Sequence, residues 1–298
     1  MSYVKQFCEK YGYEHEAISF LDKAFTKLQQ NTEAYSIFTA YVEAYEENYS
    51  LDHMTVLAAI RALEECTGIH KYTLVLLYLI CLTKHLGVLY ENEGIAADIY
   101  DFSVCDLKWK AKECHTAYGV WGNYVGGWEF GFFKMQLFAI GRLQYEIRSF
   151  PFTVDTGTVK IDKGEPYINV HIPSCGPLNE DACIESYEKA TDFFQKRYGL
   201  KRIIFGCNSW LLSPDLQRML PATSRIRAFA EHYTILEVTK DPLNKHLDKI
   251  FGVRTLPENI DELPENTNLR YTMKKWLKAG NSIDIALGVF LPNFNRGA

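Results

Sequence analysis

The stretch from Pro166 to Tyr198 constrains the fold of this chain more than any other part, because it joins a strand, a loop and a helix. Pro-Tyr-Ile-Asn-Val-His-Ile-Pro at 166–173 has the composition of a strand, and an amphipathic helix follows a short loop that contains glycine and proline. A loop that opens a helix directs several backbone N–H groups into one space, where the helix dipole adds partial positive charge. We therefore expect the loop at 174–179 to bind an anion such as a phosphate group.

Charge and cysteine usage narrow the classes of partner. The formal net charge is −5 and no run of lysine or arginine exceeds two residues, so we expect neither nucleic acid nor an anionic membrane surface as a partner. The longest uninterrupted apolar run, Leu74 to Leu82, is far shorter than the ~20 residues that cross a bilayer. The eight cysteines include no Cys-x-x-Cys pair, which indicates reduced thiols in a cytoplasmic protein and predicts no metal site.

The first part of the chain has the pattern of helices. Apolar residues recur at helical spacing, and Thr73–Tyr90 is apolar around most of its circumference, which predicts the central helix of a bundle. Four glycines between positions 119 and 127 then interrupt the helical pattern. We place a helical N-terminal domain at 1–124 and a second domain at 125–298.

The second domain has alternating strand and helix patterns. Residues 128–140 and 142–148 read as strands, and in the latter Glu146 shares one face with Arg142 and Arg148. Further strands are expected at 166–173, 202–207, 234–240 and 282–291, with helices at 181–197, after Ser213-Pro214 and at 269–278. Antiparallel strands followed by a β-α-β-α-β run predict an α+β fold: a mixed sheet flanked by helices, behind the helical domain.

Three phrases of the sequence carry a resemblance to one family. They are Gln-Leu-Phe-Ala-Ile-Gly-Arg-Leu-Gln-Tyr-Glu at 136–146, His-Ile-Pro-Ser-Cys-Gly-Pro-Leu at 171–178 and Cys-Asn-Ser-Trp-Leu-Leu-Ser-Pro at 207–214. With the order of strands and helices, they resemble a bacterial group of GNAT-like acyltransferases, in which a helical N-terminal domain precedes a GNAT-like C-terminal domain. The resemblance covers nearly the whole chain. It implies transfer of an acyl group from acyl-coenzyme A, as acetyl-CoA or a longer chain, to an amine of a small-molecule acceptor.

The same resemblance implies where the donor binds. In that fold the pantetheine lies between two splayed parallel strands, which correspond here to 166–173 and 202–207, and the pyrophosphate lies on the loop that follows the first. The residues carried over as donor contacts are Ile172, Ser174, Cys175, Gly176, Leu178, Asn179, Cys207 and Asn208. The loop departs from the usual family pattern because it has one glycine, followed by Pro177, which lacks an N–H donor.

Glu146 and His171 are the candidate bases for deprotonating an amine acceptor. Glu146 lies on the polar face of a strand, and the alternative is a surface carboxylate paired with Arg142 or Arg148. His171 ends the strand before the loop and titrates near neutral pH, and the alternative is a histidine whose hydrogen bonds are satisfied inside the sheet.

Ser209 is the candidate acid that protonates the leaving thiolate, because it follows the second parallel strand. The alternative is a serine that only begins the turn into the next helix.

Two other functions remain open from the sequence. Cys175 or Cys207 with His171 would suit a thiol-based hydrolase or transferase. A non-catalytic binding or interaction protein on a degenerate GNAT-like fold is favoured by the single-glycine loop. The sequence is also compatible with a homodimer.

Overall fold

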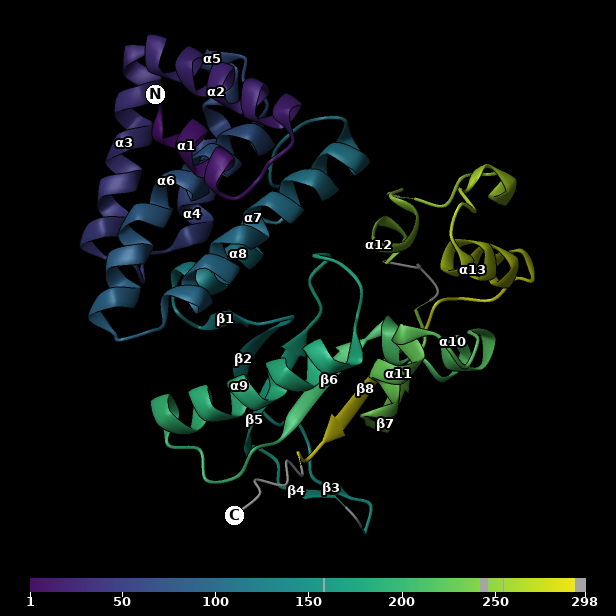
Figure 1. Ribbon diagram of the computed structural model, residues 1–298. Coiled ribbons are helices and arrows are strands. Elements are labelled where there is room, and N and C mark those ends of the chain that lie inside the picture. The colour runs from purple at the N-terminus through teal and green to yellow at the C-terminus, as the bar shows by residue number, and fades with distance from the viewer. Residues whose placement is uncertain (158, 242–245, 254, 293–298) are drawn as a thin grey trace. The chain divides into compact units, whose positions relative to one another are not determined.

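The chain forms two compact units in the computed structural model, which describes residues 1–157, 159–241, 246–253 and 255–292. The first unit is Met1–Phe138 and the second is 139–298. The division falls after the boundary expected at 124/125, because a further helix, Gly126–Phe133, packs against helices of the first unit. Figure 1 shows the elements of both units in chain order.

The first unit consists of helices in the part of the chain that the structure describes. They are α1 (Tyr3–Lys10), α2 (His15–Gln30), α3 (Thr32–Glu47), α4 (His53–Ala62), α5 (Glu64–Thr67), α6 (Lys71–Asn92), α7 (Ala97–Tyr118) and α8 (Gly126–Phe133). Helix α6 packs against most of the others, and its residues from Thr73 to Ile80 are all buried, as the sequence predicted for a central helix. It is long and apolar enough to cross a membrane, but a core helix has the same composition, and most of α6 lies inside this unit.

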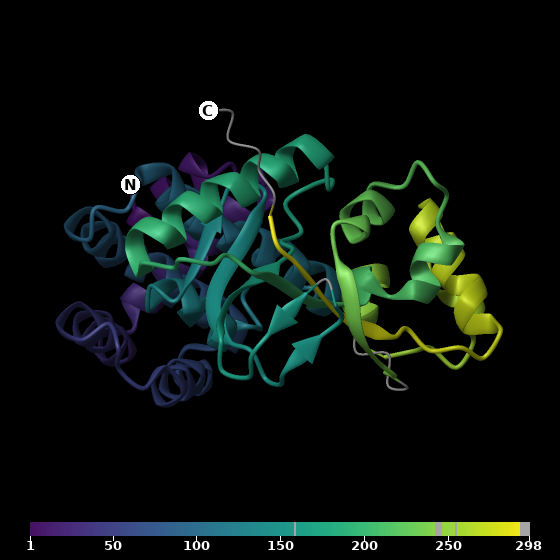
Figure 2. The same ribbon diagram turned by 90° about the horizontal axis from the view of Figure 1, so that it is seen from below.

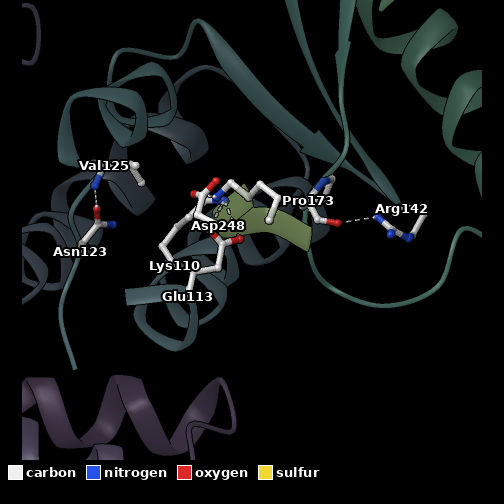
Figure 3. Close-up of polar contacts among 8 residues, drawn as sticks. Lys110, Glu113, Asn123, Val125, Arg142, Pro173 and Asp248 are labelled. Carbon is white, nitrogen blue, oxygen red and sulfur yellow. Dashed lines mark hydrogen bonds and ion pairs between the residues drawn. The ribbon is translucent and has the colours of Figure 1, made fainter. Parts of the chain in front are cut away.

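The prediction of a strand from 128 to 140 is wrong for its first half. Residues 126–133 form α8, and only Leu137–Ile140 form a strand, β1. The side-chain oxygen of Asn123 accepts a hydrogen bond from the N–H of Val125 at 2.9 Å, immediately before α8 begins (Figure 3). Because α8 is buried against α4, α6 and α7, its apolar residues show no helical period, and tertiary packing stabilises a helix that contains three glycines.

Gly122 lies against the backbone of α6. A Cβ at this position would come within 2.5 Å of the carbonyl carbon of Tyr72, and the N–H of Asn123 bonds the oxygen of that carbonyl at 2.8 Å. Replacing Gly122 by alanine is therefore expected to lower the free energy of unfolding by about 3 kcal/mol, because neither backbone can move aside. Urea unfolding measures this loss. In Gly127→Ala the new Cβ would meet only Met54 Sδ at 3.5 Å, so an equal loss in both variants would contradict the argument.

A group of polar side chains is buried in the first unit beside α7 and α8. Glu129 is fully buried, Asp106 is 2% exposed, and Asn123 is also inaccessible. Lys110 lies near this group, and its Nζ is 3.2 Å from Oε1 of Glu113 (Figure 3). Burial and the negative charge of Asp106 raise the pKa of Glu129 well above its usual range, and the charge of Lys110 offsets this only in part.

The second unit is built on a six-stranded sheet with the order β1-β2-β5-β6-β8-β7. Its remaining elements are β2 (Leu143–Ser149), β3 (Val154–Asp155), β4 (Lys160–Ile161), β5 (Pro166–His171), α9 (Glu180–Tyr198), β6 (Phe205–Ser209), η1 (Trp210–Leu212), α10 (Pro214–Met219), α11 (Arg225–Glu231), β7 (Thr234–Thr239), α12 (Leu247–Phe251), η2 (Ile260–Glu262), α13 (Asn268–Lys278) and β8 (Ile285–Phe290). The predicted α+β mixed sheet flanked by helices is confirmed.

Helix α9 covers one face of the sheet through β2. The hydroxyl groups of Tyr145 and Ser186 share a hydrogen bond at 2.6 Å, and the Tyr145 ring packs edge-on against Tyr187 and Phe194. Since side chains alternate along a strand, the neighbours of Tyr145 point to the opposite face of the sheet, away from α9.

An insertion joins the two strands β7 and β8, which pair antiparallel. It contains α12, η2 and α13, and Figure 2 shows these helices gathered with α10 and α11 beyond the β7 edge of the sheet. The two ends of the insertion are held together by an ion pair of 2.6 Å between Lys240 Nζ and the buried carboxylate of Asp284.

Candidate active site

Glu146 and His171 meet on the face of the sheet opposite α9. Strands β2 and β5 pair antiparallel with Glu146 opposite Asn169 and Gln144 opposite His171, so these side chains share one face. His171 Nε2 lies 2.6 Å from Oε1 of Glu146. The structure therefore brings together the two bases that the sequence singled out.

The carboxylate oxygen Oε1 of Glu146 receives three donors. These are His171 Nε2 at 2.6 Å, Arg148 Nε at 2.7 Å and Asn169 Nδ2 at 3.1 Å. Burial alone would raise the pKa of Glu146, but the hydrogen bond and charge of His171, with the Asn169 amide and Arg148, outweigh it and lower the pKa to about 2. Glu146 is therefore ionised at neutral pH.

This geometry assigns the proton between Glu146 and His171. An ionised oxygen and an unprotonated ring nitrogen would repel each other at 2.6 Å, so Nε2 carries the proton and donates it to Oε1. Asn169 Nδ2 also lies 2.9 Å from Nε2, but its hydrogen goes to Glu146, because a protonated Nε2 has no lone pair to accept it. In neutral His171 the basic lone pair is therefore on Nδ1.

Strands β5 and β6 form the parallel pair that the sequence predicted. Their ladder joins Ile168 to Phe205 and Asn169 to Gly206, and it extends no further among the described residues. Strand β5 continues to His171 and β6 to Ser209. Beyond the ladder, the two strand ends can therefore offer backbone groups to a third, inserted chain.

Arg142 holds the loop that follows β5, here called the 173–179 loop. Its guanidinium donates to three backbone carbonyls: Nε to Pro177 at 3.0 Å, Nη1 to Pro173 at 3.2 Å and Nη2 to Gly176 at 2.5 Å. Figure 3 shows the bond from Arg142 to Pro173. The suggested pairing of Arg142 with Glu146 is wrong, because Arg142 precedes β2 and lies in the turn after β1; the pairing of Arg148 with Glu146 is confirmed.

Three N–H groups of the 173–179 loop remain available. Those of Gly176, Leu178 and Asn179 donate to no protein acceptor in the part of the chain that the structure describes. Asn179 is the N-cap of α9, but its side chain caps no N–H of the helix. The loop thus presents unused donors at the start of a 19-residue helix, as expected for an anion-binding loop.

A groove runs beside the start of α9 within the second unit. Two adjoining cavities, about 750 and about 560 Å³ in volume, share Leu178, Thr223, Ser224 and Arg225 as lining residues. The first is also lined by Asn179, Glu180 and Asp181, and the second by Thr267 and Asn268 at the start of α13.

The other predicted site residues lie at the ends of β5 and β6. Asn208 is exposed, whereas Cys207 is fully buried, and burial raises the pKa of its thiol far above the usual range. A Cys207 thiolate is therefore disfavoured, and this residue can contact a ligand only through its backbone. Ser209 Oγ accepts the N–H of Leu211 at 3.2 Å, so it caps the short helix η1.

The loop residues of the prediction are partly accessible. Ser174, Gly176 and Asn179 are exposed, Ile172 and Cys175 are half-buried, and Leu178 is buried.

Arg142 and Asn169 are the two residues of this site whose roles sequence reasoning missed. Asn169 lies two residues before His171, so strand alternation already places it on the same face. Its contact with Glu146 depends on the register between β2 and β5, and that register is visible only in the structure. No sequence signal indicates that Arg142 binds the 173–179 loop.

Two family descriptions match the chain side by side. An "N-acyltransferase N-terminal domain" matches residues 2–135, and a "GNAT-like C-terminal domain" matches residues 137–290. Together they cover both compact units. No curated protein matches the sequence.

Solved acyltransferase structures share the fold. A mutant acyltransferase crystallised with octanoyl-CoA is 18% identical, with a TM-score of 0.75 over 97% of this chain and 88% of that one. An acyltransferase in complex with decanoyl-CoA and teicoplanin is 19% identical, with a TM-score of 0.64 over 97% and 99%. Another complex with decanoyl-CoA is 23% identical, with a TM-score of 0.62 over 73% and 66%.

Proposed function

Because the chain belongs to the family in which an N-acyltransferase N-terminal domain precedes a GNAT-like C-terminal domain, we propose that it transfers an acyl group from acyl-coenzyme A to an amine of a small-molecule acceptor. The observation that carries the proposal is the Glu146–His171 pair, which lies on β2 and β5 where the parallel β5–β6 ladder ends. A base is thus adjacent to the place where an extended donor would add to the sheet.

The donor would bind along β5 and the 173–179 loop. Its pantetheine would bond the backbone beyond the end of the ladder, near Ile172, Cys207 and Asn208. Its pyrophosphate would accept the unused N–H groups of the loop. The groove lined by Arg225 and by the start of α13 would hold the nucleotide end. Solved neighbours of the same fold were crystallised with octanoyl-CoA, decanoyl-CoA or CoA.

The acid–base chemistry follows from the proton assignment. His171 takes a proton from the amine, and ionised Glu146 stabilises the imidazolium that forms. The amine nitrogen attacks the thioester carbonyl carbon, the C–S bond breaks, and an amide forms. The thiolate of coenzyme A leaves and takes a proton through the hydroxyl of Ser209, whose oxygen accepts the Leu211 N–H. Ser209 regains a proton from water at the same time, and His171 returns the proton of the amine to solvent, so both residues end in their starting states. The reaction needs no oxidant or reductant.

The decisive experiment measures donor binding and turnover separately. Calorimetry with coenzyme A and with octanoyl-CoA is expected to show binding to the full chain, and mass spectrometry is expected to find an acylated product in a panel of primary amines. No binding at millimolar coenzyme A would overturn the proposal. Binding without turnover on any amine would instead support the non-catalytic alternative.

The structure gives less support than the sequence to a thiol-based hydrolase or transferase. Cys207 is inaccessible, and the Sγ of Cys175 lies 4.0 Å from the backbone oxygen of Arg142. His171 is directed at Glu146.

The proposed donor and the reduced state of all eight cysteines both favour the cytoplasm as the site of action. A homodimer is compatible with this proposal, and sedimentation would test it.

A further inference from the structure

We propose that Arg142 is a positioning residue that orients the 173–179 loop for the donor's phosphates, an inference that rests on the proposed function. Arg142 itself does not contact the ligand. It acts through the carbonyls of Pro173, Gly176 and Pro177, which its guanidinium holds at 3.2, 2.5 and 3.0 Å.

The geometry of the peptide bond couples each carbonyl that Arg142 binds to the N–H of the next residue. No peptide of the described chain is cis, so in each one the N–H points opposite to the C=O. When Arg142 draws in the carbonyl of Pro177, it turns the N–H of Leu178 outward. The guanidinium thus fixes the direction of the Leu178 N–H, which donates to no protein acceptor in the part of the chain that the structure describes.

The same bonds explain how the loop tolerates a proline. The carbonyl of Gly176 shares its peptide with the nitrogen of Pro177, which has no hydrogen. The bond from Arg142 to the carbonyl of Gly176 therefore involves the one peptide of the three that has no N–H group. Gly176 has a φ of +132°, a conformation that L side chains rarely adopt, and this allows its carbonyl to turn toward Arg142.

Arg142 is itself fixed by α9. It lies with Gly141 in the two-residue turn between β1 and β2, where Gly141 has a φ of +64°. Ser186 of α9 donates from Oγ to the carbonyl of Ile140 and accepts the N–H of Leu143, one bond on each side of the turn. Helix α9 thus fixes the turn that carries Arg142, and Arg142 in turn binds the loop that precedes α9.

Only an arginine can make these contacts together. Its planar group offers donors from three nitrogens in a fixed fork, whereas a lysine ammonium is a single point of charge. The acidic residues Glu180 and Asp181 follow the loop and offset the positive charges of Arg142 and Arg225, so charge alone does not favour an anion here. Binding of a phosphate therefore depends on correctly directed N–H groups, and these depend on Arg142.

The test compares Arg142→Ala and Arg142→Lys with the wild type by calorimetry against coenzyme A. Both variants are expected to raise the dissociation constant at least about tenfold, because the loop is no longer preorganised. The kcat at saturating acyl-CoA should stay within about threefold of wild type, because the Glu146–His171 pair is untouched. Non-denaturing guanidinium chloride is expected to restore part of the affinity of Arg142→Ala.

The matched control is Arg202→Ala. Arg202 bonds the carbonyl of Lys160 at 2.7 Å and Glu165 at 2.8 Å in the same unit, away from the 173–179 loop, so its loss should leave coenzyme A binding unchanged. Hydrogen–deuterium exchange of the backbone amides of residues 174–176, 178 and 179 should be faster in both Arg142 variants and unchanged in Arg202→Ala.

The outcomes separate the two proposals. If the wild type binds coenzyme A and both Arg142 variants bind it within twofold of wild type, the positioning role is overturned and the proposed function stands. A wild type that binds no coenzyme A overturns the proposed function and this inference together.

Discussion

Replacing His171 by alanine is expected to lower kcat by about 10²- to 10⁴-fold, the usual loss when a general base is removed. The dissociation constant of coenzyme A should change little, because His171 lies on the sheet face with Glu146 and not in the 173–179 loop. Steady-state kinetics with calorimetry on the same preparation measure both quantities. A variant that retains wild-type kcat would show that His171 is a structural histidine inside the sheet.

Glu146→Gln is the companion variant for this prediction. Glutamine keeps the shape of the side chain but removes the negative charge that stabilises the imidazolium of His171. The kcat should therefore fall while the dissociation constant of coenzyme A changes little, and Arg202→Ala should leave both unchanged. A Glu146→Gln variant that retains wild-type kcat would separate Glu146 from the chemistry.

Replacing Glu129 by glutamine is expected to stabilise the first unit at alkaline pH. Burial, and next the negative charge of Asp106, raise the pKa of Glu129 well above its usual range, and Lys110 offsets this only in part. The folded protein thus holds a proton that the unfolded chain releases. The resulting stability is fully present below pH ~4.5, the usual value for a glutamate, and is lost as the pH rises toward the folded-state pKa.

Glutamine mimics the protonated form and cannot ionise, so it removes this loss. Thermal unfolding at pH 6 and pH 9 should show a smaller pH dependence in Glu129→Gln, with a gain in Tm at pH 9 of roughly 2–4 °C for each kcal/mol. Glu47→Gln, at an exposed position of the same unit, should retain the pH dependence of the wild type. If Glu129→Gln also retains it, Glu129 is ionised when folded and Lys110 compensates its charge.

The strand, loop and helix at 166–198 were predictable because each step has a local signal. Strand alternation, the glycine and proline of the loop, and the amphipathic helix all depend on nearby residues. The helix α8 was not predictable in this way. Its sequence is apolar on every side, so periodicity cannot separate a buried helix from a buried strand, and only its packing against α4 and α6 decides between them.

In the candidate site, too, local patterns identify single residues, whereas their contacts depend on the tertiary structure. Glu146 and His171 could be selected because each lies on a polar or terminal position of a predicted strand. Their contact requires one register between β2 and β5, since a shift of one residue would place them on opposite faces. The bonds from Arg142 to the 173–179 loop join residues more than thirty positions apart, and no local pattern predicts them.

The antiparallel pairing of Thr239 with Ile285, with the ion pair between Lys240 and Asp284 beside it, allows the insertion between β7 and β8 to vary. Because these contacts hold its two ends together, the intervening chain can lengthen, shorten or change with only a small change in the entropy of loop closure. The start of α13, which lies in this insertion, lines the groove beside the 173–179 loop, whereas Glu146 and His171 lie on β2 and β5. Related chains can therefore diverge in what this groove accepts without rebuilding the acid–base pair.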